Sequence, residues 1–258
     1  MVSHMVHTKY KHIRLHMHIR IHGHIHIHMY LAPKRLLFIG DSLTYVNDLD
    51  QRVAFLARAA GFSEGLVIDR VVKGGAPLKK LWTKTKAKQV IKGEAAADGG
   101  ARAPWDAVIL QEDLPETDVE SFNSFAHKFH HVIAAAGAAT VLIAAWPYQR
   151  LPEFNTEAIA RAHVIAAETM TLGPCCVVHV GRAWAKAAEK HPELQLYSDD
   201  QEHPALLGTA LAAASVFSAL WGRSASVQTT SRGAGNDQED EDLKRLHDIA
   251  WQLSHHKP

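Results

Sequence analysis

Short apolar runs alternate with longer mixed segments along the chain from residue 34 onward. Each run is apolar almost throughout and is bounded by Gly, Pro or Asp. Such runs are typical of strands that are covered on both faces, because a strand with one wet face alternates apolar and polar residues. We therefore expect strands at 35–40, 66–72, 107–111, 140–146 and 176–180.

The longer segments between these strands are helix-like. They lie at roughly 49–61, 119–136, 155–171, 182–190 and 204–221. A chain that alternates strand and helix builds a parallel sheet with helices on both of its faces. The pattern therefore predicts an α/β protein with a five-stranded, doubly wound parallel sheet, in which ligands bind beyond the carboxyl ends of the strands.

The first thirty residues have a different pattern. The stretch "HIRLHMHIRIHGHIHIHMY" alternates His with Ile, Met or Leu and contains no acidic residue. Alternation of this kind can mean a strand, and clustered His can mean a metal site, but Gly23 is the only turn residue in this stretch, which is too few to fold a metal cage. We interpret residues 1–30 as a disordered low-complexity extension, with Met29 as a candidate natural start, and residues 31–227 as the folded domain.

Two further segments are expected to lie outside regular structure. Residues 84–104 are basic and then rich in Ala and Gly, which is typical of a loop or insert. Residues 228–241, "QTTSRGAGNDQEDE", read as a linker to the last amphipathic segment, "DLKRLHDIAWQLSHH". We expect residues 228–258 to return to the same domain and to pack on it as a linker and a helix.

The composition excludes several classes of protein. A net charge of +1 argues against a dedicated nucleic-acid binder, which would carry a strong basic excess. No apolar run approaches the length of a membrane-spanning helix, so no membrane partner is expected. The only cysteines, Cys175 and Cys176, are adjacent and form no disulfide framework. These features favour a reducing, cytoplasmic location.

Polar residues at two places have the pattern of a nucleophilic site. In "FIGDSLT" a buried strand ends on Gly40, Asp41 and Ser42, and in "DDQEHP" Asp200 precedes His203 by three residues. A catalytic serine needs an exposed hydroxyl, a base and amide donors for the oxyanion. Asp200 would bind one ring nitrogen of His203 and leave the other to accept the serine proton. A serine in an ordinary turn is the alternative reading.

Three segments together resemble a known family. "FIGDSLT", "VVKGGAPLKKLW" and "DDQEHP" occur in the order of the conserved blocks of the GDSL, or SGNH, hydrolases, over residues 35 to 221. The resemblance implies a flavodoxin-like three-layer α/β/α sandwich and a serine esterase that uses neither metal nor cofactor. It implies that Ser42 is the nucleophile, His203 the general acid and base, and Asp200 its orienter. Asp199 is the alternative orienter. The backbone amides of Ser42 and Gly75, with Gly74 as the alternative glycine, would form the oxyanion hole.

The third block departs from the family pattern. The family has Gly-x-Asn-Asp at this strand end, and its Asn is an oxyanion donor, whereas this chain has "VILQEDLPE". The segment resembles an SGNH subgroup with Leu-Gln-Glu in this block. The side-chain amide of Gln111 is therefore the expected third donor of the oxyanion hole.

Several functions fit these residues. The resemblance implies hydrolysis of small acyl esters, with an O-acetylated carbohydrate as the leading small-molecule substrate. Trp82 and Trp146 are candidate pocket aromatics, with core packing as the alternative. Lipid or thioester cleavage, or a catalytically silent binding domain, are the other readings. Glu112 and Asp113 suggest a glycosidase pair, but no partner acid accompanies them.

Overall fold

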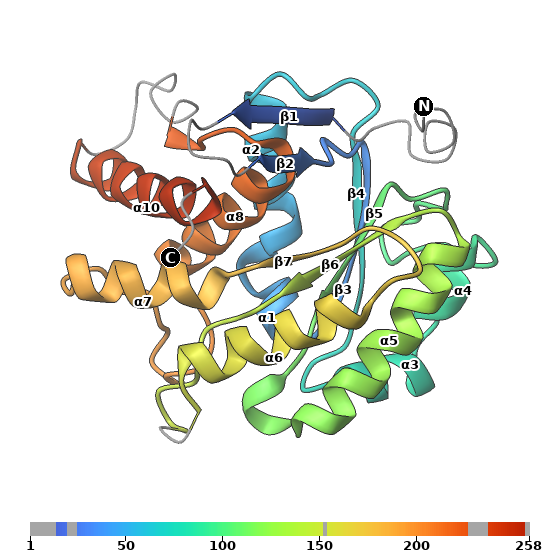
Figure 1. The fold of residues 1–258 in the computed structure, drawn as a ribbon. Coiled ribbons are helices and arrows are strands. Elements are labelled where there is room, and N and C mark those ends of the chain that lie inside the picture. The colour runs from blue at the N-terminus through green and yellow to red at the C-terminus, as the bar shows by residue number, and fades with distance from the viewer. Residues whose placement is uncertain (1–13, 20–24, 152–153, 227–236, 256–258) are drawn as a thin grey trace.

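The structure is a computed structural model, and it describes residues 14–19, 25–151, 154–226 and 237–255 (Figure 1). Its centre is a five-stranded parallel sheet with the strand order β4-β3-β5-β6-β7. All five expected strands are present, and the α/β fold is confirmed. The strands are β3 (Arg35–Gly40), β4 (Val67–Val72), β5 (Ala107–Gln111), β6 (Ala139–Ile143) and β7 (Cys175–Val178).

Helices cover both faces of the sheet, as the unbroken apolar strands require (Figure 1). Successive residues of β3 point to opposite faces, so Leu36 and Phe38 belong to one apolar core, and Leu37 and Ile39 to the other. The first core is closed by α2 (Leu49–Ala59), α7 (Val180–Lys190), α8 (Leu206–Trp221) and α10 (Asp237–His255). The second is closed by α3 (Leu78–Lys84), α4 (Ala87–Lys92), α5 (Val119–Ala135) and α6 (Thr156–Thr169).

Helix α8 is buried on nearly all sides, which explains its apolar and Ala-rich sequence. It packs against α2, α7 and α10. A side chain at Gly208 would collide with the carbonyl oxygen of Leu196 and the ring of Trp184, so the close approach requires glycine here. The loop with His203 leads directly into this helix, which gives the loop a rigid base.

The structure corrects two expected loops. Part of residues 84–104 forms α4, because Ala87, Val90 and Ile91 are buried on one side of that short helix. The expected linker at 228–241 is helical from Asp237, where acidic residues in the first turn of α10 favour the positive end of the helix dipole. Residues 227–236 lie outside the described residues.

Within the N-terminal extension, two segments that were expected to be disordered form a hairpin. Strands β1 (Arg14–Ile19) and β2 (Ile25–Tyr30) pair in antiparallel fashion. Residues 1–13 and 20–24 lie outside the described part of the chain. The division of the chain at residues 30 and 227 stays a prediction.

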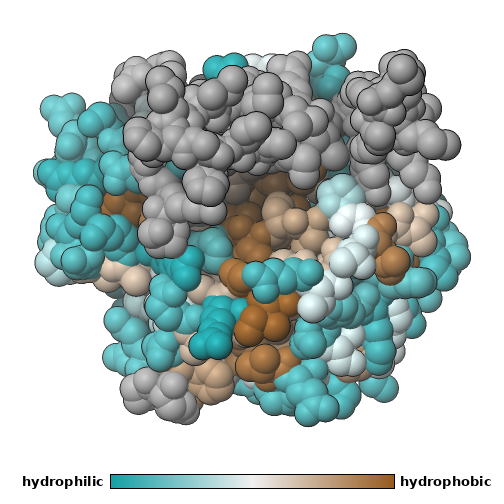
Figure 2. All heavy atoms as spheres, viewed as in Figure 1, coloured by the Kyte–Doolittle hydropathy of each residue, from teal (hydrophilic) through white to brown (hydrophobic). Residues whose placement is uncertain are grey.

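The surface is polar over much of the face in Figure 2, with apolar residues gathered at its middle, where Figure 1 shows α6 and the edge strand β7. In the described residues, no helix combines the length and apolar character needed to cross a membrane. The same residues contain no group of three or more His, Cys, Asp or Glu side chains arranged to hold a metal ion.

Candidate functional site

The order of the strands places Ser42 at the switch point of the sheet. The chain passes from β3 to β4 on one side and returns to β5 on the other side of β3. Loops that leave neighbouring strands in opposite directions open a crevice at their carboxyl ends, where ligands of doubly wound sheets bind. Ser42 follows β3 and begins the short helix α1 (Ser42–Tyr45) at this crevice.

The turn before Ser42 is fixed by its neighbours. The carboxylate of Asp41 caps α1, because its Oδ1 accepts a hydrogen bond from the Leu43 N–H at 2.8 Å. Gly40 has no room for a side chain, since a Cβ there would meet Thr44 Oγ1 and Gln111 Oε1. Ser42 itself is half-buried, and its hydroxyl makes no hydrogen bond to any residue that the structure describes. The hydroxyl is therefore free to meet a ligand.

The glycines of the second block lie beside α1. Gly75 has a φ of +54°, a left-handed conformation that favours glycine, and a Cβ at Gly74 would lie 2.8 Å from the Tyr45 hydroxyl. Within the described residues, neither glycine N–H has a hydrogen-bond partner. The first N–H of a helix also lacks a partner within the helix, which applies to Ser42. Free backbone donors thus lie on two neighbouring loops.

The predicted acid and base are in direct contact. His203 Nδ1 lies 2.7 Å from Asp200 Oδ2, and Asp200 Oδ1 accepts the backbone N–H groups of His203 and Glu202 at 2.9 and 3.0 Å. Burial raises the pKa of Asp200, but the Glu202 N–H and the His203 contacts outweigh it and hold that pKa below its ordinary value. The carboxylate therefore stays charged and orients the His203 ring.

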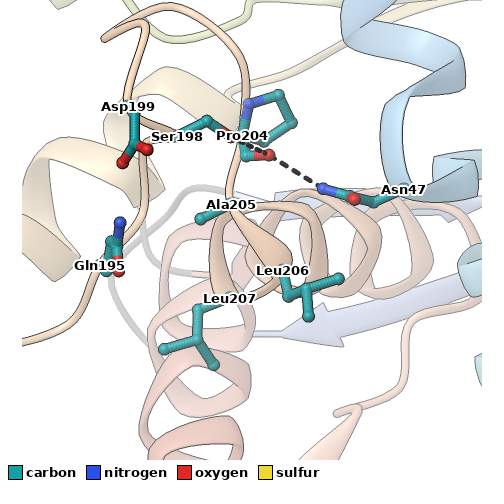
Figure 3. Close-up of a pocket in the computed structure, with 8 residues that line it drawn as sticks. All are labelled: Asn47, Gln195, Ser198, Asp199, Pro204, Ala205, Leu206 and Leu207. Atoms are coloured by element: carbon teal, nitrogen blue, oxygen red, sulfur yellow. Dashed lines mark hydrogen bonds between the residues drawn. The ribbon is translucent and has the colours of Figure 1, made fainter.

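The loop that begins at Ser42 (the serine loop) and the loop that carries Asp200 and His203 (the histidine loop) are joined by hydrogen bonds. Asn47, five residues after Ser42 in the chain, donates from Nδ2 to the Pro204 carbonyl oxygen at 2.9 Å (Figure 3). It also donates to Thr209 Oγ1 at 3.0 Å. His203 is also close enough to Asp41 to lower the pKa of that carboxyl electrostatically. No hydrogen bond joins Ser42 to His203 in the described part of the chain. Such bonds are often long in free enzymes and tighten with substrate.

The loop after β6 holds the histidine loop from the other side. The Trp146 indole donates to the Glu202 carbonyl oxygen at 3.0 Å, and the Gln149 N–H donates to that of Gln201 at 2.9 Å. The Arg150 guanidinium pairs with Glu202 and with Glu116. The sequence pattern did not indicate these contacts, because nothing in the spacing of residues 146–150 distinguishes an anchoring loop from any other.

Gln111 lies at the end of β5 with its side chain bonded at both polar atoms. Its Oε1 accepts from the Asp41 N–H and from the Thr44 hydroxyl, each at 2.9 Å, and its Nε2 donates to the Glu112 carbonyl oxygen at 3.0 Å. Gln111 is only 2% exposed. The side chain thus reaches the turn that carries Ser42.

Buried carboxyl groups lie beneath this turn. Burial raises the pKa of Glu112 to about 8, although its carboxyl accepts N–H bonds from Leu78 and Asp113. Burial and then the charge of Asp113 raise the pKa of Asp41 to about 7. Burial also raises the pKa of Asp113, whose Oδ1 accepts a 2.7 Å hydrogen bond from the Tyr148 hydroxyl. Glu112 and Asp113 are thus held in internal contacts beside the Ser42 turn.

Comparisons with solved structures show what this arrangement is similar to. A candidate SGNH hydrolase from Slackia heliotrinireducens is 25% identical with a TM-score of 0.52, and the match covers 69% of this chain and 94% of that one. A DUF4886 family protein from Bacteroides uniformis is 15% identical with a TM-score of 0.56, covering 86% and 96%. An acetylxylan esterase mutant from Geobacillus stearothermophilus is 15% identical with a TM-score of 0.51, covering 70% and 90%. No family model matches the sequence, and no curated protein does.

The fold shared with the candidate SGNH hydrolase from Slackia heliotrinireducens, together with the three motifs at the carboxyl ends of the strands, decides the superfamily. The chain belongs to the SGNH/GDSL hydrolase superfamily. The three-layer sandwich expected from the resemblance is confirmed. Hydrolase is accordingly its general class, whereas the bond it cleaves and the roles of individual residues are matters of proposal.

The two tryptophans do not have the environment of pocket aromatics in this SGNH hydrolase. Trp146 is 2% exposed and stacks on Trp184 with ring centroids 4.1 Å apart, so no free face remains for a sugar. Trp82 packs edge-on against Phe129, and the Lys88 ammonium covers its ring. Both side chains therefore fit the alternative of core packing, because neighbouring side chains pack against their rings.

The raised pKa of Asp41 predicts a pH-dependent cost to stability. Its folded-state pKa of about 7 exceeds the unfolded value, so the folded protein holds this proton longer and stability falls as pH rises through about 4 to 7. Asp41→Asn keeps an acceptor for the Leu43 N–H but cannot ionise. We expect the difference in the free energy of unfolding between Asp41→Asn and the parent to be roughly 2–3 kcal/mol more in favour of the variant at about pH 8 than at about pH 5.

Urea unfolding of both proteins at the two pH values measures this difference. Asp237→Asn, at the exposed start of α10, is the matched control and should show no such change with pH. A difference between Asp41→Asn and the parent that stays constant over this range would show that Asp41 is ionised throughout.

Proposed function

We propose that this SGNH hydrolase is a serine esterase that cleaves small carboxylic esters through an acyl-enzyme. The observation that carries the proposal is the 2.7 Å contact between His203 and Asp200, in a loop that Asn47 ties to the Ser42 segment. An oriented His, in a loop tied to the segment of a free serine hydroxyl at a strand end, supplies the groups that nucleophilic acyl transfer needs. A turn serine with only a capping role would not require the Asp–His pair.

The reaction follows from these groups. Ser42 Oγ attacks the ester carbonyl carbon and passes its proton to His203 Nε2, while Asp200 stabilises the imidazolium that forms. The backbone N–H groups of Ser42 and Gly75, with Gly74 as the alternative glycine, donate to the oxyanion. His203 then gives the proton to the leaving alkoxide, which leaves as the alcohol. Water, deprotonated by His203, then attacks the acyl-enzyme, and His203 returns that proton to Ser42 Oγ as the bond to the acyl carbon breaks and the acid leaves.

A groove beside the histidine loop is the proposed site for the alcohol part of the ester (Figure 3). Its volume of about 440 Å³ is in the range of small-molecule sites. Leu206, 61% exposed, offers an apolar surface, and Asp199 and Gln195 offer polar groups. This mixture fits a polyhydroxy alcohol, whose hydroxyls meet polar groups while its C–H faces lie on apolar ones. An O-acetylated carbohydrate is therefore the proposed substrate class.

A series of 4-nitrophenyl esters with acyl chains of increasing length tests this proposal. We expect the full chain to hydrolyse the acetate with the highest kcat/KM and the rate to fall steadily as the acyl chain lengthens. Acetylated sugars should then be deacetylated, with acetate release as the measurement. No hydrolysis of any ester would contradict the esterase, and a preference for long acyl chains would replace the small-acyl substrate with a lipid or thioester.

A further inference from the structure

One oxygen atom of Gln111 accepts hydrogen bonds from both sides of the turn that carries Ser42. Oε1 accepts from the N–H of Asp41, directly before Ser42, and from the hydroxyl of Thr44, two residues after it. Gly40 makes this approach possible, because any Cβ at that position would lie 2.6 Å from Gln111 Oε1. Ser42 thus lies between two residues that a single buried acceptor connects to the end of β5.

The backbone supplies oxyanion donors without the Gln111 amide. The N–H of Ser42 begins α1, and those of Gly74 and Gly75 have no hydrogen-bond partner in the described residues. Two backbone N–H groups are sufficient for an oxyanion hole in serine hydrolases. The Gln111 Nε2 already donates to the Glu112 carbonyl oxygen, and the whole side chain is 2% exposed. A group so buried and so bonded is better placed to orient the turn than to meet the substrate.

We propose that Gln111 is a positioning residue, which sets the turn carrying Ser42 through Asp41 and Thr44 and does not itself donate to the oxyanion. This role rests on the proposed esterase function, because it has meaning only if Ser42 is the nucleophile. It also explains how the chain lacks the Asn of the third block while keeping the other motifs. The Gln side chain reaches the turn with its carbonyl oxygen instead of reaching the substrate with its amide.

The variant Gln111→Glu separates the two roles. A protonated Glu keeps a carbonyl oxygen for Asp41 and Thr44, and its single O–H can donate to the Glu112 carbonyl oxygen. It has no second hydrogen for an oxyanion. Direct donation therefore predicts a loss of about 10²- to 10³-fold in kcat at every pH. Positioning predicts a loss below about tenfold when the new carboxyl is protonated. The loss should be much larger when it is ionised, because a carboxylate cannot donate to the Glu112 carbonyl oxygen and its charge is repelled by Asp41 and Glu112, which displaces the side chain from the turn.

The surroundings indicate where that change occurs. The groups nearest to this position are Asp41, Glu112 and Asp113, with Tyr148 beyond Asp113 and His203 across the crevice. Burial raises the pKa of Asp41 to about 7 and of Glu112 to about 8, and a new carboxyl among them is subject to the same burial. We expect Gln111→Glu to approach the parent near about pH 5.5 and to fall at least about tenfold further by about pH 9.

Thr44 gives a second, independent variant. Thr44→Val removes the hydroxyl that Gln111 Oε1 accepts, at nearly constant volume, and Thr44→Ser keeps it as the matched control. Positioning predicts that kcat of the Val variant is about tenfold below that of the Ser variant with KM unchanged. Equal kcat values in the two variants would contradict the coupling of Thr44 through Gln111 to Ser42.

The readouts are the rate of fluorophosphonate labelling and the hydrolysis of 4-nitrophenyl acetate, each relative to the parent protein at the same pH. Circular dichroism and thermal unfolding verify that the variants are folded. A parent that neither labels nor hydrolyses would overturn the esterase itself. A parent that labels, with Gln111→Glu impaired 10²- to 10³-fold even near pH 5.5, would overturn only the positioning role and restore Gln111 as an oxyanion donor.

Discussion

Replacing Ser42 with alanine is expected to lower kcat on 4-nitrophenyl acetate by at least about 10⁴-fold, toward the rate that binding and oxyanion donors alone support. The reason is that Ser42 Oγ forms the acyl-enzyme, and no other hydroxyl begins a helix at the switch point of the sheet in the described structure. The fold should be unaffected, because the Ser42 hydroxyl makes no hydrogen bond to a described residue.

The matched control for this loss is Ser254→Ala. Ser254 donates to the Ala250 carbonyl oxygen in α10 and lies near Leu220 at the C-terminal end of α8, whereas the site lies at its N-terminal end, so its removal should leave kcat within about twofold. Initial rates of the two variants and the parent, with thermal unfolding to verify folding, decide the comparison. Hydrolysis by Ser42→Ala at the rate of Ser254→Ala would show that Ser42 is not the nucleophile.

Asp200→Asn is expected to lower kcat by about 10³- to 10⁴-fold. Asp200 Oδ2 accepts from His203 Nδ1 at 2.7 Å and keeps the proton on that nitrogen, which leaves Nε2 free to act as the base. An Asn amide can present an N–H to Nδ1 instead and so favour the wrong tautomer. The loss should appear in kcat with little change in KM, because Asp200 contacts the base and not the substrate.

Asp199→Asn is the comparison that identifies the orienting acid. Asp199 lines the groove of Figure 3 and makes no hydrogen bond to a described residue, so its replacement should change KM for sugar acetates and leave kcat within a few-fold. Steady-state kinetics on the two variants separate the roles. If Asp199→Asn lost kcat and Asp200→Asn did not, the assignment of the acid would be reversed.

Much of the sheet was predictable because its strands are buried on both faces. The strands at 35–40 and 107–111 have the predicted bounds, since each is a continuous apolar run that stops at a change to polar residues. The strand expected at 140–146 ends at Ile143 instead. Its apolar run continues, but the neighbouring strand β7 ends at Val178, and Ala144–Trp146 turn away into the core. In the sequence, apolar residues that are buried beyond the end of a strand cannot be distinguished from apolar residues buried within it.

The ends of helices were less predictable where tertiary contacts determine them. Pro204 was expected to open the helix, yet α8 begins at Leu206, because Pro204 forms a bridge with Tyr197 and binds Asn47 through its carbonyl oxygen. That contact joins residues far apart in the chain and has no local sequence signal. It is also the contact that brings the histidine loop to the serine loop.

Some contacts of the candidate site could be predicted from the sequence, and others depend on the fold. Asp200 and His203 meet because they are three positions apart in one loop, so their contact could be predicted from spacing. The hydrogen bonds of the Gln111 side chain could not be predicted, since they depend on the position of Thr44 and on the absence of a Cβ at Gly40. Trp146 has an apolar position in the sequence whether it lines a pocket or stacks on Trp184, and only the fold distinguishes the two.

The most direct test of the esterase is covalent labelling by a fluorophosphonate, which reacts with activated serines and requires no knowledge of the substrate. We expect one adduct on the intact parent protein, located on Ser42 by peptide mass spectrometry, and none on Ser42→Ala. A folded parent protein that gains no adduct, or an adduct that persists in Ser42→Ala, would show that Ser42 is not an activated nucleophile.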